Sequence, residues 1–172
     1  MNWKYLLPNL STAQTLARAQ SALGHHTKYQ LGAGGINPLE PFPAACDCSG
    51  FVAWSIGIPR ELPPGSAHWI YTDGIWSGGL PLKAGLFIET SIADATAGDL
   101  LVYPHNLEGE HGHVGIILKT ANNLPSKVVH CSLGNDRHFG DAVRITGPSV
   151  FLSGNHPTRA MKINYALLKE FI

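Results

Sequence analysis

The sequence predicts an α+β protein in which helices come first and an antiparallel sheet follows. Two helical segments with capping residues lie in the N-terminal part of the chain. Beyond residue 86, short apolar or β-branched runs are separated by Gly, Pro and Asn, which is the pattern of strands joined by turns. A block of helices followed by a block of strands is typical of α+β folds. The length of 172 residues fits one domain, so we predict a single domain over residues 1–172.

Residues 12–23 are predicted to form the first helix. Ser11 and Gln14 have the Ser-x-x-Gln spacing of a capping box, and Gly24 follows the last apolar position. The segment has a modest apolar face. We expect this face to pack against the next helix, which is a structural role rather than a functional one.

A second helix is predicted over residues 48–56. Asp47 is a good N-cap, and the apolar run that follows it ends before Gly57. A third, short helix is predicted to begin at Ser66 and to stop near Gly74. The second helix matters most for function because its first residue is a cysteine.

Four later segments have the length and composition of strands: Leu100–Tyr103, His113–Leu118, Lys127–Ser132 and Ala142–Ile145. The C-terminal segment 161–172 is predicted to be a last strand that packs on the sheet. Side chains alternate between the two faces of a strand. His130 and Cys131 should therefore point to opposite faces, and His113 should point away from the core-facing Val114.

Composition and charge exclude several classes of function. Charged residues make up only 14% of the chain, against about 25% in typical soluble domains. The formal net charge is zero and the basic residues are scattered, so the sequence offers no electrostatic footprint for nucleic acid. No run approaches the roughly 18 apolar residues of a membrane span.

The three cysteines do not form a disulfide framework, and synthesis in a reducing cytoplasm is expected. The sequence is compatible both with a disulfide between Cys46 and Cys131 and with free thiols at these positions. The N-terminal segment 1–8 is interrupted by Pro8 and lacks the continuous apolar core of about 7–15 residues that a secretory signal needs.

Cys48 and His113 are the candidate nucleophile and general base. Cys48 falls in the first turn of the predicted helix, where the helix dipole and unpaired backbone N–H groups favour a thiolate. His113 has glycines on either side, and Gly115 is expected to leave room for a substrate. His130, on the next predicted strand, is the candidate for the group that orients His113. The backbone N–H of Cys48 would stabilise an oxyanion.

A metal site is the alternative chemistry for the same region. His111 and His113 have a His-x-His spacing that can chelate zinc, with His105 nearby, and Cys46 and Cys48 form another possible half-site. These spacings match no common zinc motif. We therefore expect no metal and no other cofactor.

The motifs around these residues resemble those of the NlpC-type peptidoglycan cysteine peptidases. The segment Asp47–Gly50 resembles the nucleophile motif of that family, and Gly112–Ile116 resembles its base motif. Lys28–Gly32 is similar to its Tyr-containing segment, and Ala97–Leu101 to its Gly-Asp-Leu turn. His130 lies where the third polar residue of the family is expected.

The resemblance covers residues 11–133 and implies a papain-like NlpC fold with a cysteine hydrolase activity on bacterial peptidoglycan. It also implies that Tyr29, Asp47 and Ser49 hold the N-terminal part of a cell-wall stem peptide. Asp47 and Ser49 equally fit a purely structural role as helix caps. Leu31 stands where the family commonly has an aromatic residue, a difference that concerns the substrate pocket.

Several activities are compatible with this resemblance. The bond that it implies first is the one between D-glutamate and the diamino acid of the stem peptide, so that the enzyme would be a DL-endopeptidase. An N-acetylmuramoyl-L-alanine amidase or a phage endolysin on the same fold is the first alternative. A non-catalytic module that binds wall peptides is the second alternative. Acyl transfer would use the same residues as hydrolysis.

The sequence shows neither a signal peptide nor a repeated wall-binding module. We therefore expect synthesis in a bacterial cytoplasm and action on peptidoglycan after delivery by another route, either injection into a rival bacterium or release with a phage. An injected antibacterial effector would need a cognate inhibitor protein that covers the Cys48 cleft. The expected partners are thus the stem peptide and such an immunity protein.

Overall fold

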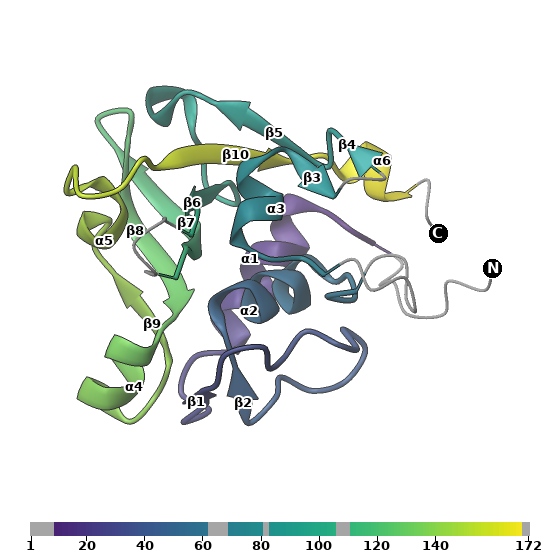
Figure 1. Cartoon of the computed structure of the whole chain (residues 1–172), viewed down its shortest axis with the longest axis vertical. Helices are drawn as coiled ribbons and strands as arrows, with labels where there is room; N and C mark the ends of the chain where they lie inside the picture. The colour runs from purple at the N-terminus through teal and green to yellow at the C-terminus, as the bar shows by residue number, and fades with distance from the viewer. Residues whose placement is uncertain (1–8, 62–68, 81–82, 106–110, 170–172) are drawn as a thin grey trace.

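The computed structural model describes residues 9–61, 69–80, 83–105 and 111–169 (Figure 1). Its helices are α1 (Thr12–Ser21), α2 (Cys48–Ile56), α3 (Thr72–Trp76), α4 (Leu133–Phe139), α5 (Ser149–Leu152) and α6 (Tyr165–Lys169), with a 3₁₀ turn at Ile92–Asp94. Over the described ranges, no helix combines the length and the apolar character needed to cross a membrane.

Six antiparallel strands form the main sheet in the order β5-β10-β6-β7-β8-β9. These strands are β5 (Phe87–Thr90), β6 (Leu100–Tyr103), β7 (His113–Ala121), β8 (Leu124–Cys131), β9 (Val143–Thr146) and β10 (Arg159–Ile163). Two short pairs are β1 (Lys28–Tyr29) with β2 (Ala45–Cys46), and β3 (Gly79–Leu80) with β4 (Lys83–Ala84). The predicted α+β fold, with N-terminal helices followed by an antiparallel sheet, is confirmed.

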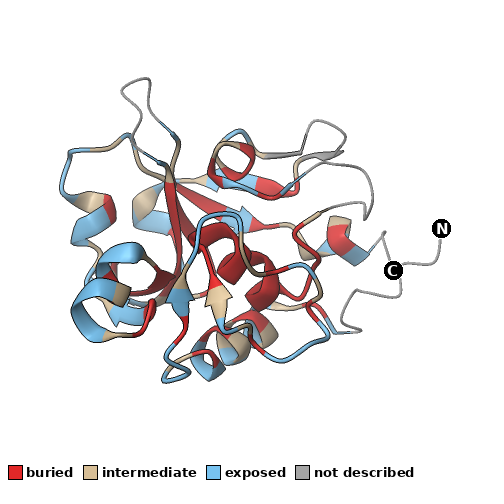
Figure 2. Ribbon diagram, turned by 60° about the horizontal axis from the view of Figure 1, so that its bottom comes forward, coloured by how far each residue is buried: buried red, intermediate tan, exposed pale blue. Residues whose placement is uncertain are grey.

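Helix α2 is the buried centre of the fold. All nine of its residues are buried, and Figure 2 shows them as a red coil surrounded by other elements. Asp47 caps its start, with Oδ1 accepting a hydrogen bond from the Gly50 N–H at 2.8 Å. Gly57 ends it in the left-handed conformation, with φ of 92°. Both helix ends match the prediction, and α1 packs against α2 as expected.

The main sheet has an apolar cluster on each face. On the face toward α2, Val114 and Ile116 of β7 belong to the same core as Phe51. On the other face, Ile117 packs with Phe151 of α5. In Figure 1, α5 and α4 accordingly lie on the opposite side of the sheet from α1 and α2. The predicted direction of Val114, into the core, is confirmed.

Strands β7 and β8 form a long hairpin that places the two predicted site histidines. Its turn residues, Asn122 and Asn123, have φ of 52° and 58°, as a two-residue type I′ turn requires. Both strands therefore run further toward the turn than predicted. Ile116 pairs with Val129, which sets His130 on the next position of β8 and brings it beside the start of β7.

The C-terminal segment differs from the prediction of one last strand over residues 161–172. Strand β10 ends at Ile163, and α6 follows it directly. Asn164 starts this helix because its Oδ1 accepts the N–H of Leu167 at 3.1 Å. Residues 170–172 lie outside the described part of the chain.

The predicted third helix also begins later than expected. Ser66, its proposed cap, lies outside the described residues, and α3 starts at Thr72. Trp69 is not helical but forms an isolated bridge with Glu61. This bridge places Trp69 beside Glu61, a few residues after the end of α2.

Candidate active site

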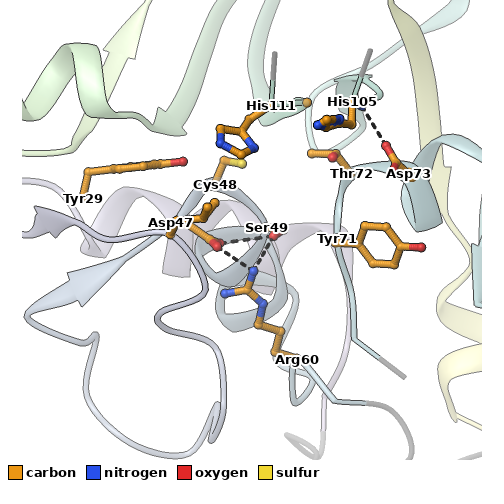
Figure 3. A pocket seen from close by; sticks show the side chains of 12 residues that line it. Tyr29, Asp47, Cys48, Ser49, Arg60, Tyr71, Thr72, Asp73, His105 and His111 are labelled. Carbon is orange, nitrogen blue, oxygen red and sulfur yellow. Dashed lines mark hydrogen bonds and ion pairs between the residues drawn. The ribbon is translucent and has the colours of Figure 1, made fainter. Parts of the chain in front are cut away.

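Cys48, the first residue of α2, lines a cavity of about 200 Å³. In Figure 3 its thiol lies near the centre of the view, with Tyr29 on one side and Thr72 and His105 on the other. All three predicted substrate residues, Tyr29, Asp47 and Ser49, line this cavity. The other lining residues are Leu31, Arg60, Tyr71, Thr72, Asp73, His105, His111 and Gly112.

A buried ion pair lies beside the candidate nucleophile. Arg60 Nη2 is 2.6 Å from Asp47 Oδ2, and both side chains are almost fully buried. Ser49 Oγ accepts from Arg60 Nη2 at 2.9 Å and donates to Asp47 Oδ1 at 3.1 Å. Asp47 Oδ2 also accepts the N–H of Gly32 at 2.7 Å, and Arg60 Nη1 donates to the Ala33 carbonyl at 2.8 Å. The pair ties the start of α2 to the preceding loop and thereby holds Cys48 in place.

Gly50 allows the loop and the helix to approach this closely. A Cβ at residue 50 would lie 2.4 Å from the carbonyl oxygen of Ala33 and 2.9 Å from that of Gly34. A side chain there would push the loop away from α2 and stretch the bond from Arg60 to Ala33. The glycine of the Asp47–Gly50 motif is therefore required by the packing of the loop against α2 next to Cys48.

His113 and His130 are joined by a short hydrogen bond. His113 Nε2 lies 2.7 Å from His130 Nδ1, and His130 Nε2 lies 3.0 Å from Thr146 Oγ1 of β9. Both imidazoles are buried. Cys131 points to the opposite face, as strand alternation predicts, and its thiol donates to the Cys46 carbonyl at 3.3 Å. The structure thus brings the predicted base and the predicted orienting residue together.

Phe151 of α5 forms the wall behind both imidazoles. Its ring stacks on His113 with centroids 5.1 Å apart and planes at 11°, and it meets His130 edge-on at 5.8 Å. A Cβ at residue 115 would lie 3.1 Å from Phe151 Cζ and 3.0 Å from His130 Cβ. The expectation that Gly115 leaves room for a substrate is therefore wrong, because the side chains of Val128, His130 and Phe151 fill that space.

Burial keeps both imidazoles uncharged near neutral pH. It lowers the pKa of His113 to about 3, with smaller contributions from His130 and His156. It lowers the pKa of His130 to about 4. Each ring therefore has one protonated nitrogen and one nitrogen that can accept a hydrogen bond at pH 7.

The Cys48 thiol is also neutral at rest. Burial, followed by the Asp47 carboxylate, raises the pKa of Cys48 to about 12. The backbone N–H groups of Val114 and Ser49 and the Arg60 guanidinium lower it, but by less. The position of Cys48 at a helix start, taken alone, predicts a thiolate. Desolvation has the larger effect on its pKa, because burial disfavours the charged form. Over the described residues the thiol makes no hydrogen bond to either imidazole, and at neutral pH the thiol and the imidazole of His113 are both uncharged.

Alkylation of Cys48 is expected to be slow at neutral pH and to accelerate as the pH rises. Only the thiolate reacts, and with a pKa of about 12 its fraction grows about tenfold per pH unit. The measurement is the iodoacetamide rate between pH 6 and 10, followed by mass spectrometry in a Cys46→Ser/Cys131→Ser background. A rate that levels off below pH 8 would show that the thiolate already exists at neutral pH.

A second cavity, of about 310 Å³, adjoins the first. Its lining residues are Tyr29, Tyr103, His111, Gly112, His113, Ser132, Leu133, Gly134 and Val150. Tyr29, His111 and Gly112 line both cavities. Cys48 thus faces the first compartment and His113 the second, an arrangement suited to an extended substrate that spans both.

Tyr29 stands at the junction of the two cavities and is held there by its backbone. Its N–H donates to Asp136 Oδ2 at 3.0 Å, while Lys28 Nζ lies 3.1 Å from Asp136 Oδ1. Burial, together with nearby Cys48 and Asp47, raises the pKa of the Tyr29 hydroxyl above its ordinary value. The hydroxyl therefore remains protonated and can donate a hydrogen bond to a ligand.

The described residues do not assemble the alternative metal chemistry. Within those ranges, no group of three or more His, Cys, Asp or Glu side chains is arranged to hold a metal ion. His105 and His111 meet edge-on, with ring centroids 5.6 Å apart. The three cysteines are free and buried, so no disulfide joins Cys46 to Cys131.

Three residues of the site carry no recognisable signal in the sequence. Arg60 is an isolated basic residue after an apolar helix, and its buried partner Asp47 is thirteen positions away. Asp73 enters the first cavity from α3, and Thr146 reaches His130 from β9. Each joins the site through a tertiary contact that no local pattern describes.

No family model and no curated protein sequence matches the chain. Solved structures do match it. One, described as similar to a lipoprotein of the NLP/P60 family from Staphylococcus aureus subsp. aureus Mu50, has a TM-score of 0.50 and 18% identity over 90% of this chain and 42% of that one. The structure of Ly7917 has a TM-score of 0.48 and 10% identity over 89% of this chain and 62% of that one. The first likeness shows that the chain has the NLP/P60 fold, and the predicted fold is thereby confirmed.

Proposed function

We propose that this protein is a cysteine hydrolase that cleaves an amide bond in the stem peptides of bacterial peptidoglycan. One observation carries the proposal: a cysteine at the start of a buried helix lines an open cavity beside the strand whose first residue, His113, is bonded to His130. The NLP/P60 fold supports the same reading, because the structural neighbour belongs by its description to that family.

The chemistry follows from the two neutral groups. His113 Nδ1, the ring nitrogen not bonded to His130, takes the Cys48 proton as the sulfur attacks the amide carbonyl. The Cys48 backbone N–H stabilises the oxyanion. The imidazolium then gives its proton to the leaving nitrogen, and the C–N bond breaks to leave a thioester. A water molecule, deprotonated by His113, attacks the thioester carbonyl, and the C–S bond breaks to release a carboxylic acid and restore the thiol.

The favoured bond is the one between D-glutamate and the diamino acid, with Tyr29, Asp47 and Ser49 near the N-terminal part of the stem peptide. Asp47 is already bonded on both carboxylate oxygens, so we assign it mainly to holding the site in shape. An N-acetylmuramoyl-L-alanine amidase is the nearest alternative, since it needs the same catalytic groups.

Digestion of purified sacculi is the test of activity and of the bond. Sacculi of several wall types are incubated with the protein, and the released fragments are weighed by mass spectrometry. Fragments that end in D-glutamate identify the DL-endopeptidase, whereas intact stem peptides freed from the glycan identify the amidase. If no wall type yields fragments, the proposed function is wrong.

The two histidines are expected to differ in importance. His113→Ala should lower kcat by about a thousandfold, because proton transfer to and from the sulfur is lost. His130→Gln should lower kcat by only about tenfold, because the amide oxygen can still accept the His113 Nε2–H. Turnover of a fluorogenic stem peptide measures both. The reverse ranking would mean that the base has been misplaced.

Asp73 gives the first cavity a negative character. Among the described lining residues, Asp47 and Arg60 neutralise each other at 2.6 Å. Asp73 has no such cationic partner in that set, and its Oδ1 accepts the backbone N–H of His105 at 2.8 Å. A substrate segment with a protonated amine is therefore favoured in this cavity.

Asp73→Asn is expected to lower kcat/KM for a stem peptide with a free amine by about fivefold, the size of a partly exposed ion pair. The same peptide with an acetylated amine should be cut equally well by both proteins. Asp94→Asn, an exposed carboxylate in the 3₁₀ turn, is the control. Equal loss on both peptides would assign Asp73 to the shape of the cavity instead.

A further inference from the structure

The hydrogen bonds around His130 determine which atom carries the proton in each bond from Thr146 through His130 to His113. Thr146 Oγ1 lies 2.9 Å from the Gly147 carbonyl, which can only accept, so the threonine proton is used there. Thr146 must therefore accept from His130 Nε2–H across 3.0 Å. His130 is neutral, so its Nδ1 is a bare acceptor, and the 2.7 Å bond must be donated by His113 Nε2–H. His113 Nδ1 is then left with a free lone pair.

The opposite arrangement would disable the base. If the Thr146 hydroxyl turned to donate to His130 Nε2, His130 would carry its proton on Nδ1 and would donate to His113 Nε2. His113 would then hold its proton on Nδ1, the nitrogen that has to receive the proton of the thiol. The two arrangements have the same heavy-atom positions, and they differ only in the direction of the hydrogen bonds. The bond from Thr146 to the Gly147 carbonyl is what separates them.

We propose that Thr146 is a positioning residue that sets the direction of the hydrogen-bond chain and so keeps His113 Nδ1 available as the base. This inference rests on the proposed roles of Cys48 and His113. Thr146 touches neither of them directly and acts through His130, on the edge strand β9. The hydrogen bonding of Thr146 fits such a role, because the backbone carbonyl of the next residue, Gly147, accepts the threonine hydroxyl proton.

The test uses Thr146→Val, which keeps the β-branched shape and removes the hydroxyl. Imidazole ¹⁵N NMR of the whole protein reads the tautomer directly. In the wild type we expect His113 with a bare Nδ1, and in Thr146→Val a mixture of both tautomers. With a stem peptide as substrate, kcat should fall about tenfold with KM unchanged, because the competent tautomer becomes a minor population.

Two variants control the experiment. Thr146→Ser keeps the hydroxyl and should restore the wild-type NMR pattern and kcat. Thr120→Val makes the same chemical change at an exposed position of β7 and should alter neither. A wild-type tautomer in Thr146→Val, or a protonated His113 Nδ1 in the wild type, overturns the inference. If the wild type cuts no peptide, the proposed function fails, while the NMR result still decides whether Thr146 controls the tautomer.

Discussion

Cys48→Ser is expected to abolish hydrolysis of sacculi, with a loss of at least about 10⁴-fold, while the fold stays intact. Loss of a covalent nucleophile has effects of this order in hydrolases. Serine fits the site, since residue 48 needs only a small side chain in the first turn of α2. Its hydroxyl is a weaker nucleophile than sulfur and hardly ionises near neutral pH. Fragment release measures activity, and circular dichroism checks the fold.

The other two cysteines supply matched controls. Cys46 and Cys131 are equally buried, and each thiol donates to a backbone carbonyl, of Asp47 and Cys46 respectively. A serine hydroxyl can donate to the same carbonyls, so Cys46→Ser and Cys131→Ser should keep most of the activity. Substantial turnover by Cys48→Ser would remove the nucleophile assignment.

Asp47→Ala is expected to lower the free energy of unfolding by about 3–5 kcal/mol, as when one partner of a buried ion pair is removed. The change leaves the Arg60 guanidinium buried without its carboxylate. It also removes the N-cap bond to Gly50, worth about 1 kcal/mol. Urea unfolding followed by tryptophan fluorescence gives the free energy.

Two further variants isolate the pair. Glu89→Ala breaks the exposed pair with Arg159, at 3.4 Å, and should cost under about 1 kcal/mol. In Asp47→Ala/Arg60→Met no unpaired charge is left, so the double variant should be less destabilised than the sum of its single changes. Additive losses would contradict a coupled buried pair.

Local patterns predicted the elements whose signals lie within a few residues. Asp47 and Gly57 mark the ends of α2, and they act through bonds to their own helix. Strand β6 has its predicted bounds for the same reason, since an apolar run between turn residues suffices. The prediction of a strand over residues 161–172 was wrong, because apolar residues suit a strand and a helix equally. Asn164 starts a helix there by accepting the N–H of Leu167.

The residues of the candidate site divide in the same way. Cys48, His113 and His130 stand in short motifs with capping or strand patterns, so the sequence by itself made them candidates and predicted the helix start and strand faces on which they lie. Their protonation was decided only by the tertiary structure, because desolvation depends on all the elements that enclose a side chain. Arg60 and Thr146 became part of the site only when folding brought distant segments within hydrogen-bond distance. A sequence records which groups are available, whereas burial and contacts between distant segments determine the charge that each one carries.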